Sequence, residues 1–381
     1  VMNISFKETG SAEIDDTLLA AGYIDKEVAV SLLSFYDLKK ILSFARSLNE
    51  KGHGKRITYS KKIFLPITNL CSNDCAYCGY KKEPNKGGGY LDERSAIKLI
   101  KAGAALGCSE ALIMSGERPE AKYAEARKFL KDMGFSSTAE YACHVAELAL
   151  DNGLLPHINI GILTRDEIAK LKKCSASMGL MLESSSRELL NKGGPHHLSP
   201  SKDPDIRIRM IEEAGELRVP FTTGILIGIG EKLEDIVDSL FIIKRLKEKY
   251  GHIQEVIIQP FRPEKGTRME NHPQTPLELL QRTIAVARLI FGPSMNIQSP
   301  PNLSDCESIV LAGANDLGGI SPLTVDYVNP LYPWPDLEEL KNRCSRLGYE
   351  LNKRLPVYPE FIEKPGFLDE RLLQLIKRLG V

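Results

Sequence analysis

The chain has 381 residues, of which 43% are hydrophobic and 26% are charged, as in an ordinary globular protein. Lysine plus arginine and aspartate plus glutamate each number 50, so no net charge attracts nucleic acid or an anionic membrane. No run reaches the roughly 18 apolar residues of a membrane-spanning helix. The first residues lack the basic and apolar regions of a secretion signal, so we expect a cytoplasmic protein.

Helices are expected first, over residues 13–50, where apolar positions recur at three-and-four spacing. After residue 60, short apolar strands alternate with helices. The expected strands are Ile63–Thr68, Glu110–Ser115, His157–Leu163, Gly179–Glu183, Phe221–Ile229, Glu255–Phe261, Met295–Ser299 and, with a weaker pattern, Gly313–Ser321. The expected helices are Asp92–Leu106, Ser137–Asn152, Thr164–Lys173, Pro204–Leu217, Glu231–Tyr250 and Pro276–Ile290.

This alternation predicts the fold class. Near-continuous apolar strands separated by helices indicate parallel βαβ units. Their number favours an α/β fold built as a parallel (β/α) TIM-like barrel, full or partial, over an open doubly wound sheet, which stays the alternative. We expect an N-terminal helical extension over residues 1–55, the barrel over 56–325 and a C-terminal helical segment over 326–381.

Three cysteines stand close together in "CSNDCAYC", directly after the first expected strand. Loops in this position carry function in barrels. Thiolates of Cys71, Cys75 and Cys78 can each bind one iron of a cubane cluster, and because such clusters usually take four cysteines, one iron stays open. A zinc site completed by a distant histidine, or three unbound thiols, remain alternatives. The other cysteines, at 108, 143, 174, 306 and 344, are expected to be small apolar fillers.

The spacing Cys-x3-Cys-x2-Cys, with an aromatic residue before the last cysteine, resembles the radical S-adenosylmethionine (SAM) superfamily. The resemblance implies a [4Fe-4S] cluster held by Cys71, Cys75 and Cys78, with SAM on the open iron. One electron from the cluster then cleaves SAM to methionine and a 5′-deoxyadenosyl radical. Tyr77 is implied to lie near the adenine.

The same resemblance implies further SAM contacts. In "MSGERPE", Ser115, Gly116 and Glu117 replace the Gly-Gly-Glu that holds the methionine amino group, so the first glycine is missing. Glu183 in "LMLESSS" is implied to bind the ribose, and Arg207 the SAM carboxylate, for which a guanidinium is well suited. Gly228 and Gly230 in "GILIGIGE" are implied to approach the adenine. An ordinary Glu183–Arg207 surface pair and a plain strand-to-helix turn are the alternatives.

Phrases from about residue 60 to 335, among them "ITNLCSNDCAYC", "GGPHHLSPSKDP" and "GANDLGGISPLT", narrow the resemblance. They resemble the separate cyclising subunits of the 7,8-didemethyl-8-hydroxy-5-deazariboflavin (FO) synthase family, which serve coenzyme F-420 biosynthesis. The resemblance implies a lyase that converts 5-amino-5-(4-hydroxybenzyl)-6-(D-ribitylimino)-5,6-dihydrouracil, hereafter the adduct, to FO. Ammonia, methionine and 5′-deoxyadenosine are released. It also implies a tyrosine-using partner subunit that makes the adduct, and an electron donor.

A polar substrate calls for polar residues at the strand ends. The candidates, each of which could instead cap a loop, are Asn159, Thr223, Gln259, Arg262, Gln298, Asn302, Asn315 and Asp316. Adjacent His196 and His197 are possible acids or bases. The competing functions are a sister radical SAM enzyme, either the tyrosine-cleaving partner or a menaquinone-pathway enzyme, and a non-enzymatic iron–sulfur or zinc protein.

Overall fold

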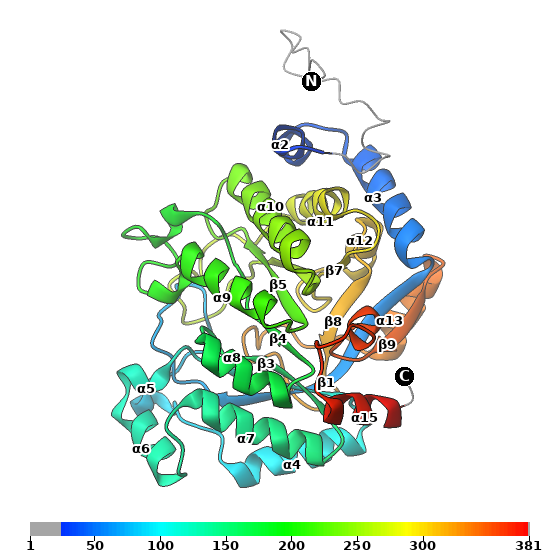
Figure 1. Cartoon of the computed structure of the whole chain (residues 1–381). Coiled ribbons are helices and arrows are strands. Elements are labelled where there is room, and N and C mark those ends of the chain that lie inside the picture. Colours follow the sequence, from blue (N-terminus) through cyan, green and yellow to red (C-terminus); the bar gives the residue numbers. More distant parts are fainter. Residues whose placement is uncertain (1–23, 380–381) are drawn as a thin grey trace.

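Eight parallel strands form a closed barrel in the computed structural model, which describes residues 24–379 (Figure 1). Each strand pairs with the next along the chain, and β8 pairs back to β1. This confirms the TIM-like barrel, in its full form, and excludes the open sheet. The strands are β1 (Arg56–Thr68), β2 (Glu110–Ser115), β3 (Leu155–Asn159), β4 (Ser177–Gly179), β5 (Phe221–Ile227), β6 (Ile253–Pro260), β7 (Asn296–Gln298) and β8 (Asp316–Ile320).

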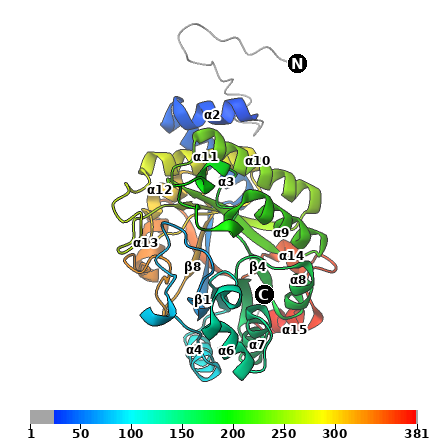
Figure 2. The same cartoon turned by 90° about the vertical axis from the view of Figure 1, so that its left-hand side faces the viewer.

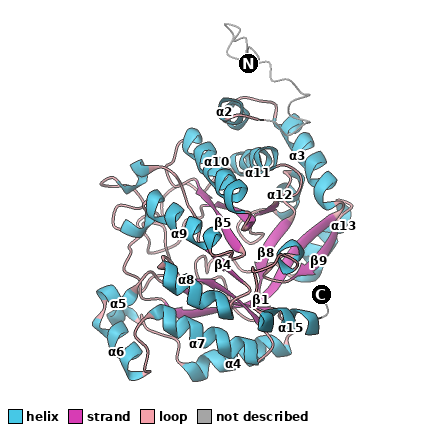
Figure 3. Ribbon diagram, in the orientation of Figure 1, coloured by secondary structure: helices cyan, strands magenta, loops and turns pink. Residues whose placement is uncertain are grey.

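Helices surround the strands on the outside (Figure 3). The six helices expected after residue 60 are confirmed within a few residues, whereas the short α5, α6 and α12 were not predicted. Local signals set the ends: Thr164 and Glu167 form a capping box at the start of α8. The helices are α4 (Glu93–Ala105), α5 (Pro119–Lys122), α6 (Ala124–Asp132), α7 (Thr138–Asp151), α8 (Arg165–Leu171), α9 (Pro204–Glu216), α10 (Leu233–Tyr250), α11 (Leu277–Phe291) and α12 (Cys306–Leu311). Single 3-10 turns are η1 (Pro84–Lys86), η2 (Lys172–Cys174), η3 (Arg187–Leu190) and η4 (Pro200–Lys202).

Two N-terminal helices, α2 (Lys26–Ser34) and α3 (Leu38–His53), pack against α10 and α11 on one side of the barrel (Figure 2). Asp25 and Asp37 cap them, each carboxylate accepting a backbone N–H of the first turn. The part of the predicted helical stretch that falls on residues 13–23 lies outside the described residues. No helix among the described residues is long and apolar enough to cross a membrane.

The C-terminal segment contains a strand as well as helices. Its elements are α13 (Leu337–Arg346), β9 (Glu350–Arg354), α14 (Pro359–Ile362) and α15 (Glu370–Arg378). Strand β9 lies parallel to the first residues of β1, from Arg56 to Ser60. The pattern did not reveal β9 or this part of β1, because polar or charged residues interrupt both and neither contains an apolar run.

Beyond β9 the chain crosses the amino end of the barrel. The carbonyl of Pro356 accepts hydrogen bonds from Ser177 Oγ at 2.7 Å and from Gln254 Nε2 at 2.9 Å. Apolar side chains of this segment, Leu355, Val357 and Phe361 among them, form a second buried cluster against β3. Each such buried side chain contributes about 1.5–3 kcal/mol. The C-terminal segment therefore covers the amino end of the barrel.

Candidate functional site

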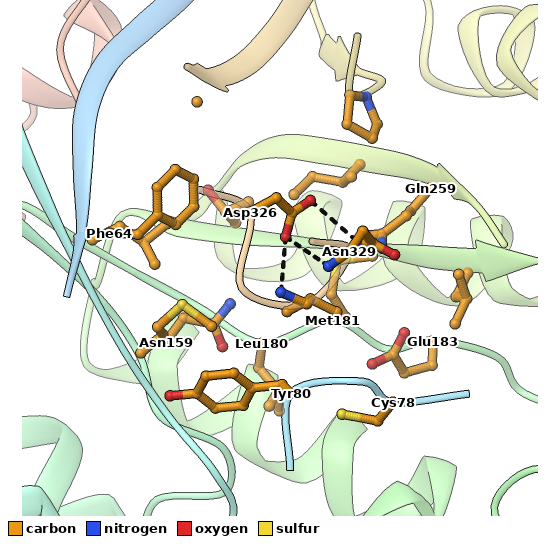
Figure 4. A pocket seen from close by; sticks show the side chains of 18 of the residues that line it. Phe64, Cys78, Tyr80, Asn159, Leu180, Met181, Glu183, Gln259, Asp326 and Asn329 are labelled. Atoms are coloured by element: carbon orange, nitrogen blue, oxygen red, sulfur yellow. Dashed lines mark hydrogen bonds between the residues drawn. The ribbon is translucent and has the colours of Figure 1, made fainter. Parts of the chain in front are cut away.

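A cavity of about 370 Å³ occupies the inside of the barrel, within the range of small-molecule sites. Its wall combines the cysteine loop, residues on or just after the barrel strands, Arg354 from the C-terminal segment, and the loop that follows β8, as Figure 4 shows for Phe64, Cys78, Tyr80 and Glu183. In that loop, Asp326 accepts hydrogen bonds from the backbone N–H groups of Val328 and Asn329. Most of the predicted site residues face this one space.

Cys71, Cys75 and Cys78 all line the cavity and are half-buried. Burial raises the pKa of the Cys71 thiol to about 12 and also raises the pKa of Cys78. The Glu117 backbone N–H donates to Cys71 Sγ at 3.1 Å, which favours the thiolate. Among the described residues, no three His, Cys, Asp or Glu side chains converge on one ion position. Three thiols on one wall suit a cluster, in which each thiolate takes a different iron.

The turn after β2 touches the cysteine loop. A Cβ at Gly116 would lie 2.1 Å from the Leu70 carbonyl oxygen and 2.6 Å from Cys71 Cβ, so this approach requires glycine. Ser115 Oγ donates to the Gly116 carbonyl at 2.9 Å. All three residues of the Ser115–Glu117 turn line the cavity beside the cysteines, and their contact with SAM stays a prediction.

The Glu117 carboxylate is held firmly. It accepts from the backbone N–H of Ile162 at 3.1 Å and from Ser201 Oγ at 3.0 Å. Burial raises its pKa, while Arg207 and Ser201 oppose the rise. A Cβ at Gly161 would lie 2.5 Å from Glu117 Oε2, so a glycine makes room for this carboxylate.

Glu183, Arg207 and Lys202 form a buried charge cluster. Lys202 makes an ion pair with Glu183, and Arg207 Nη2 lies 3.8 Å from the same carboxylate. Burial would raise the pKa of Glu183, but the two cations outweigh it and the pKa is lowered. Glu183 and Arg207 both line the cavity and lie side by side, though buried and not as a surface pair; their contacts with SAM stay predictions. Lys202 was not predicted, since nothing in "SPSKDP" distinguishes it from a surface lysine.

Of the residues expected near the adenine, one lines the cavity and two do not. Tyr77 lines the cavity, but its hydroxyl lies 3.0 Å from His196 Nε2. Its ring packs against a small apolar cluster that includes Leu189 and Leu226. Gly228 and Gly230 are not part of the cavity wall. They have φ angles of 89° and 114° in a turn whose N–H groups bind Glu231, and a Cβ at Gly228 would lie 2.3 Å from Thr275 Oγ1. The alternative, a strand-to-helix turn, describes these two glycines.

Half of the substrate candidates reach the cavity: Asn159, Gln259, Arg262 and Gln298 line it. Arg262 donates to the Leu303 carbonyl at 2.6 Å and makes no ion pair within residues 24–379. Gly318 makes room for Gln298, because a Cβ there would lie 2.2 Å from Gln298 Nε2.

The other four candidates do not line the cavity, so their assignment is corrected. Thr223 faces outward and its hydroxyl accepts the Leu182 N–H, while the neighbouring Thr222 faces inward. Asn302 donates to Asp326 and to the Tyr332 carbonyl. Asn315 binds Arg288 at 2.8 Å, and Asp316 pairs with Arg354. These last three are structural hydrogen-bonding groups.

Sequence reasoning also missed charged residues at the amino end of the cavity. Lys62, Glu110, His157, Glu255 and Arg354 all line it there. A signal was present, because Lys62, Glu110 and Glu255 stand within or beside stretches that read as buried strands. Charged residues at such positions are rarely buried without a partner.

Comparison with known proteins gives the family. Residues 65–243 match the model of the radical SAM superfamily. The 7,8-didemethyl-8-hydroxy-5-deazariboflavin synthase of Methanopyrus kandleri is 46% identical over 329 residues, covering 85% of this chain and 98% of that one. That of Methanosarcina barkeri is 46% identical over 325 residues, covering 85% and 97%. The FO synthase of Streptomyces avermitilis is 43% identical over 343 residues, 87% of this chain but only 40% of that longer protein.

Solved structures support the fold alone. Methylornithine synthase (PylB) superposes with a TM-score of 0.69 at 21% identity, covering 88% of this chain and 97% of that one. The FeFe-hydrogenase maturase HydG from Carboxydothermus hydrogenoformans gives 0.74 at 20% identity, covering 96% and 89%. On the strength of the closer relatives, this chain belongs to the radical SAM superfamily and, within it, to the family of 7,8-didemethyl-8-hydroxy-5-deazariboflavin synthases.

Proposed function

We propose that the protein is the lyase that converts the adduct to FO in coenzyme F-420 biosynthesis, with release of ammonia, methionine and 5′-deoxyadenosine. The observation that carries the proposal is that three cysteines, the buried charge cluster of Glu183, Lys202 and Arg207, and three side-chain amides all face one cavity inside the barrel. The 46% identity to synthases of this name, over nearly their whole length, supports the same reaction.

Cys71, Cys75 and Cys78 would hold a [4Fe-4S] cluster, and the polar groups beside them would hold SAM. When bound, the two supply a 5′-deoxyadenosyl radical that removes a hydrogen atom from the substrate. The donor set fits, because the Glu117 N–H stabilises a thiolate at Cys71 and Gly116 lets the turn after β2 lie directly against the cysteine loop. The protein's own contribution is to place reactants and exclude water.

The cluster of Glu183, Lys202 and Arg207 suits the amino-acid end of SAM. Lys202 and Arg207 face Glu183, and both also act on the buried carboxyl of Glu117, so this place offers cations and carboxyl groups together to the ammonium and carboxylate of SAM. Arg207 donates from Nε to the Met181 carbonyl and from Nη1 to the Ser201 carbonyl, and these two hydrogen bonds fix the plane of its guanidinium. A substrate carboxylate can bind a guanidinium so held through charge-assisted hydrogen bonds.

The middle of the cavity suits the rings of the adduct. The rings of Phe64 and Trp334 stack with centroids 5.2 Å apart and line the wall. The amides of Asn159, Gln259 and Gln298 offer donors and acceptors together, which matches the edge of a uracil. Burial lowers the pKa of Arg262, and its remaining N–H groups suit a carbonyl or phenolic oxygen of the substrate.

A partner subunit and an electron donor complete the proposal. This chain covers 40% of the Streptomyces avermitilis FO synthase, so that protein has room for a second module that makes the adduct. A separate tyrosine-using partner would play that part here. The unbridged cysteines suit the reducing cytoplasm as the place of action.

The test is reconstitution without oxygen followed by incubation with SAM and the synthetic adduct. We expect about four irons per chain, formation of 5′-deoxyadenosine and a product with deazaflavin fluorescence. Cys78→Ala should abolish SAM cleavage, whereas Cys108→Ala, at a buried position outside the cavity, should not. Turnover with free tyrosine alone would favour the sister enzyme, and one zinc without SAM cleavage would favour a metal-carrying protein.

A further inference from the structure

The amino end of the cavity is closed by charged and polar side chains, in contrast to its aromatic middle. This floor consists of Lys62, Glu110, His157, Thr222, Glu255 and Arg354. Lys62 Nζ lies 2.6 Å from Glu110 Oε1. Arg354 Nη2 lies 2.7 Å from Glu255 Oε1, and its Nε lies 2.6 Å from Asp316, just behind the floor.

A glycine and the strand β9 make it possible for this layer to lie inside the barrel. A Cβ at Gly319 would lie 1.9 Å from Lys62 Cε, so the glycine lets the lysine side chain lie inside the barrel. Arg354 arrives from β9, outside the ring of eight strands. The C-terminal segment therefore does more than close the barrel, because it supplies a wall of the cavity.

Lys62 and Glu255 each keep hydrogen-bonding capacity unused by the protein. An ammonium has three N–H donors, and within residues 24–379 that of Lys62 contacts only Glu110 as an acceptor. A carboxylate has about four acceptor sites. Glu255 accepts from Arg354 at 2.7 Å, from the Tyr358 hydroxyl at 2.9 Å and from Thr222 Oγ1 at 3.2 Å, so one site remains on Oε2.

His157 adds an acceptor of defined tautomer. Its Nδ1 lies 2.7 Å from Ser177 Oγ, and the Ser177 hydroxyl already donates to the Pro356 carbonyl. Nδ1 must therefore carry the hydrogen, which leaves Nε2 as a bare acceptor. Burial lowers the pKa of His157 to about 4, so the ring is neutral at pH 7. In the described part of the chain, Nε2 makes no hydrogen bond.

We propose that the floor recognises the polyhydroxyl chain of the substrate, the ribityl chain of the adduct. The inference rests on the proposed function and names the part of the substrate that reaches this end. An anionic group would face Glu110, Glu255 and Asp316, and a cationic group would face Lys62 and Arg354. An apolar group would leave buried donors and acceptors unpaired, which is costly. Hydroxyls both donate and accept, so a row of them matches the unused donors of Lys62 and acceptors of Glu255 and His157.

The test compares the binding of two deazaflavins to reconstituted full-length protein by their fluorescence: FO, and the same ring system with a methyl group in place of the ribityl chain. Wild type should bind FO at least tenfold more tightly, because charged hydrogen bonds to the chain are lost in the methyl compound. Glu255→Gln should reduce this ratio severalfold while leaving the affinity for the methyl compound unchanged. The double variant K62M/E110Q removes the second ion pair as a unit and should do the same.

Glu50→Gln is the matched control. Glu50 also contacts an arginine, a lysine and a tyrosine hydroxyl, Arg46, Lys55 and Tyr349, but lies on α3 outside the cavity. It should leave the ratio unchanged. Equal affinities of wild type for the two compounds, or variants that weaken both alike, would overturn the inference even if the adduct is converted. Discrimination by wild type, lost in the variants, without conversion of the adduct would sustain the inference and refute the proposed function.

Discussion

Lys202 and Glu183 meet as an ion pair in the cavity wall, where the long segment between β4 and α9 folds back so that two residues 19 positions apart come together. Glu183 holds its carboxylate there from a left-handed backbone with φ of 67°, a conformation that costs about 1 kcal/mol or more for a residue with a side chain. Strain of this kind persists where the surroundings enforce it, and here the cations Lys202 and Arg207 do so.

Lys202→Met should therefore weaken SAM binding about tenfold or more, because it removes one of the two buried cations and leaves Arg207 as the only cation beside Glu183 in the described residues. Iron content after reconstitution should be unchanged. Equilibrium binding of SAM to the reconstituted variant measures the effect. Lys232→Met is the control, since Lys232 pairs with Glu188 on the exposed surface. Equal SAM affinity in the two variants would show that Lys202 takes no part in SAM binding.

Tyr77→Phe should lower the free energy of unfolding, whether or not it also changes SAM binding. The Tyr77 hydroxyl is the partner of His196 Nε2, and His196 Nδ1 is buried without a partner in residues 24–379. Burial lowers the pKa of His196 to about 3, so the ring stays neutral and depends on this bond. Losing it should cost about 1–3 kcal/mol in the free energy of unfolding, measured in urea. Tyr59→Phe, whose hydroxyl makes no hydrogen bond to the described residues, should cost far less.

Two neighbouring threonines offer a test of which strand face lines the cavity. Thr222→Val removes the hydroxyl that donates to Glu255 and should raise KM for the adduct severalfold. Thr223→Val alters a residue whose hydroxyl faces the Leu182 N–H, outside the cavity, and should leave KM unchanged. Steady-state kinetics with the two variants decide between the faces. The reverse order of effects would mean that the strand is turned the other way.

The same two residues show where sequence reasoning ends. Apolar runs predicted the order of the strands, although the expected Gly179–Glu183 overlaps β4 only at Gly179, and the family resemblance implied roles for the cysteine loop, Glu183 and Arg207. The face of a strand could not be predicted, because a shift of one residue exchanges every side chain between lumen and exterior. Buried charges were missed for another reason. Lys62 and Glu255 find their partners Glu110 and Arg354 far along the chain, and only the closed barrel brings them together.

Stability should fall with rising pH through the ionisation of Glu255. Burial raises its pKa from 4.5 to about 7; Arg354 and, more weakly, Tyr358 and Lys62 oppose the rise, while Asp316 adds to it. The folded state thus binds this proton more tightly than the unfolded chain, so the stabilisation is complete below pH 4.5 and is lost as the pH passes 7.

Glu255→Gln removes the ionisation but keeps the shape of the side chain. The difference in the free energy of unfolding between wild type and this variant should therefore shift against wild type by on the order of 2 kcal/mol between about pH 5 and pH 8. Urea titrations of both proteins at several pH values measure it, and groups common to both cancel in the difference. Parallel pH profiles would show that Glu255 ionises at an ordinary carboxyl pKa, with Arg354 compensating fully for its burial.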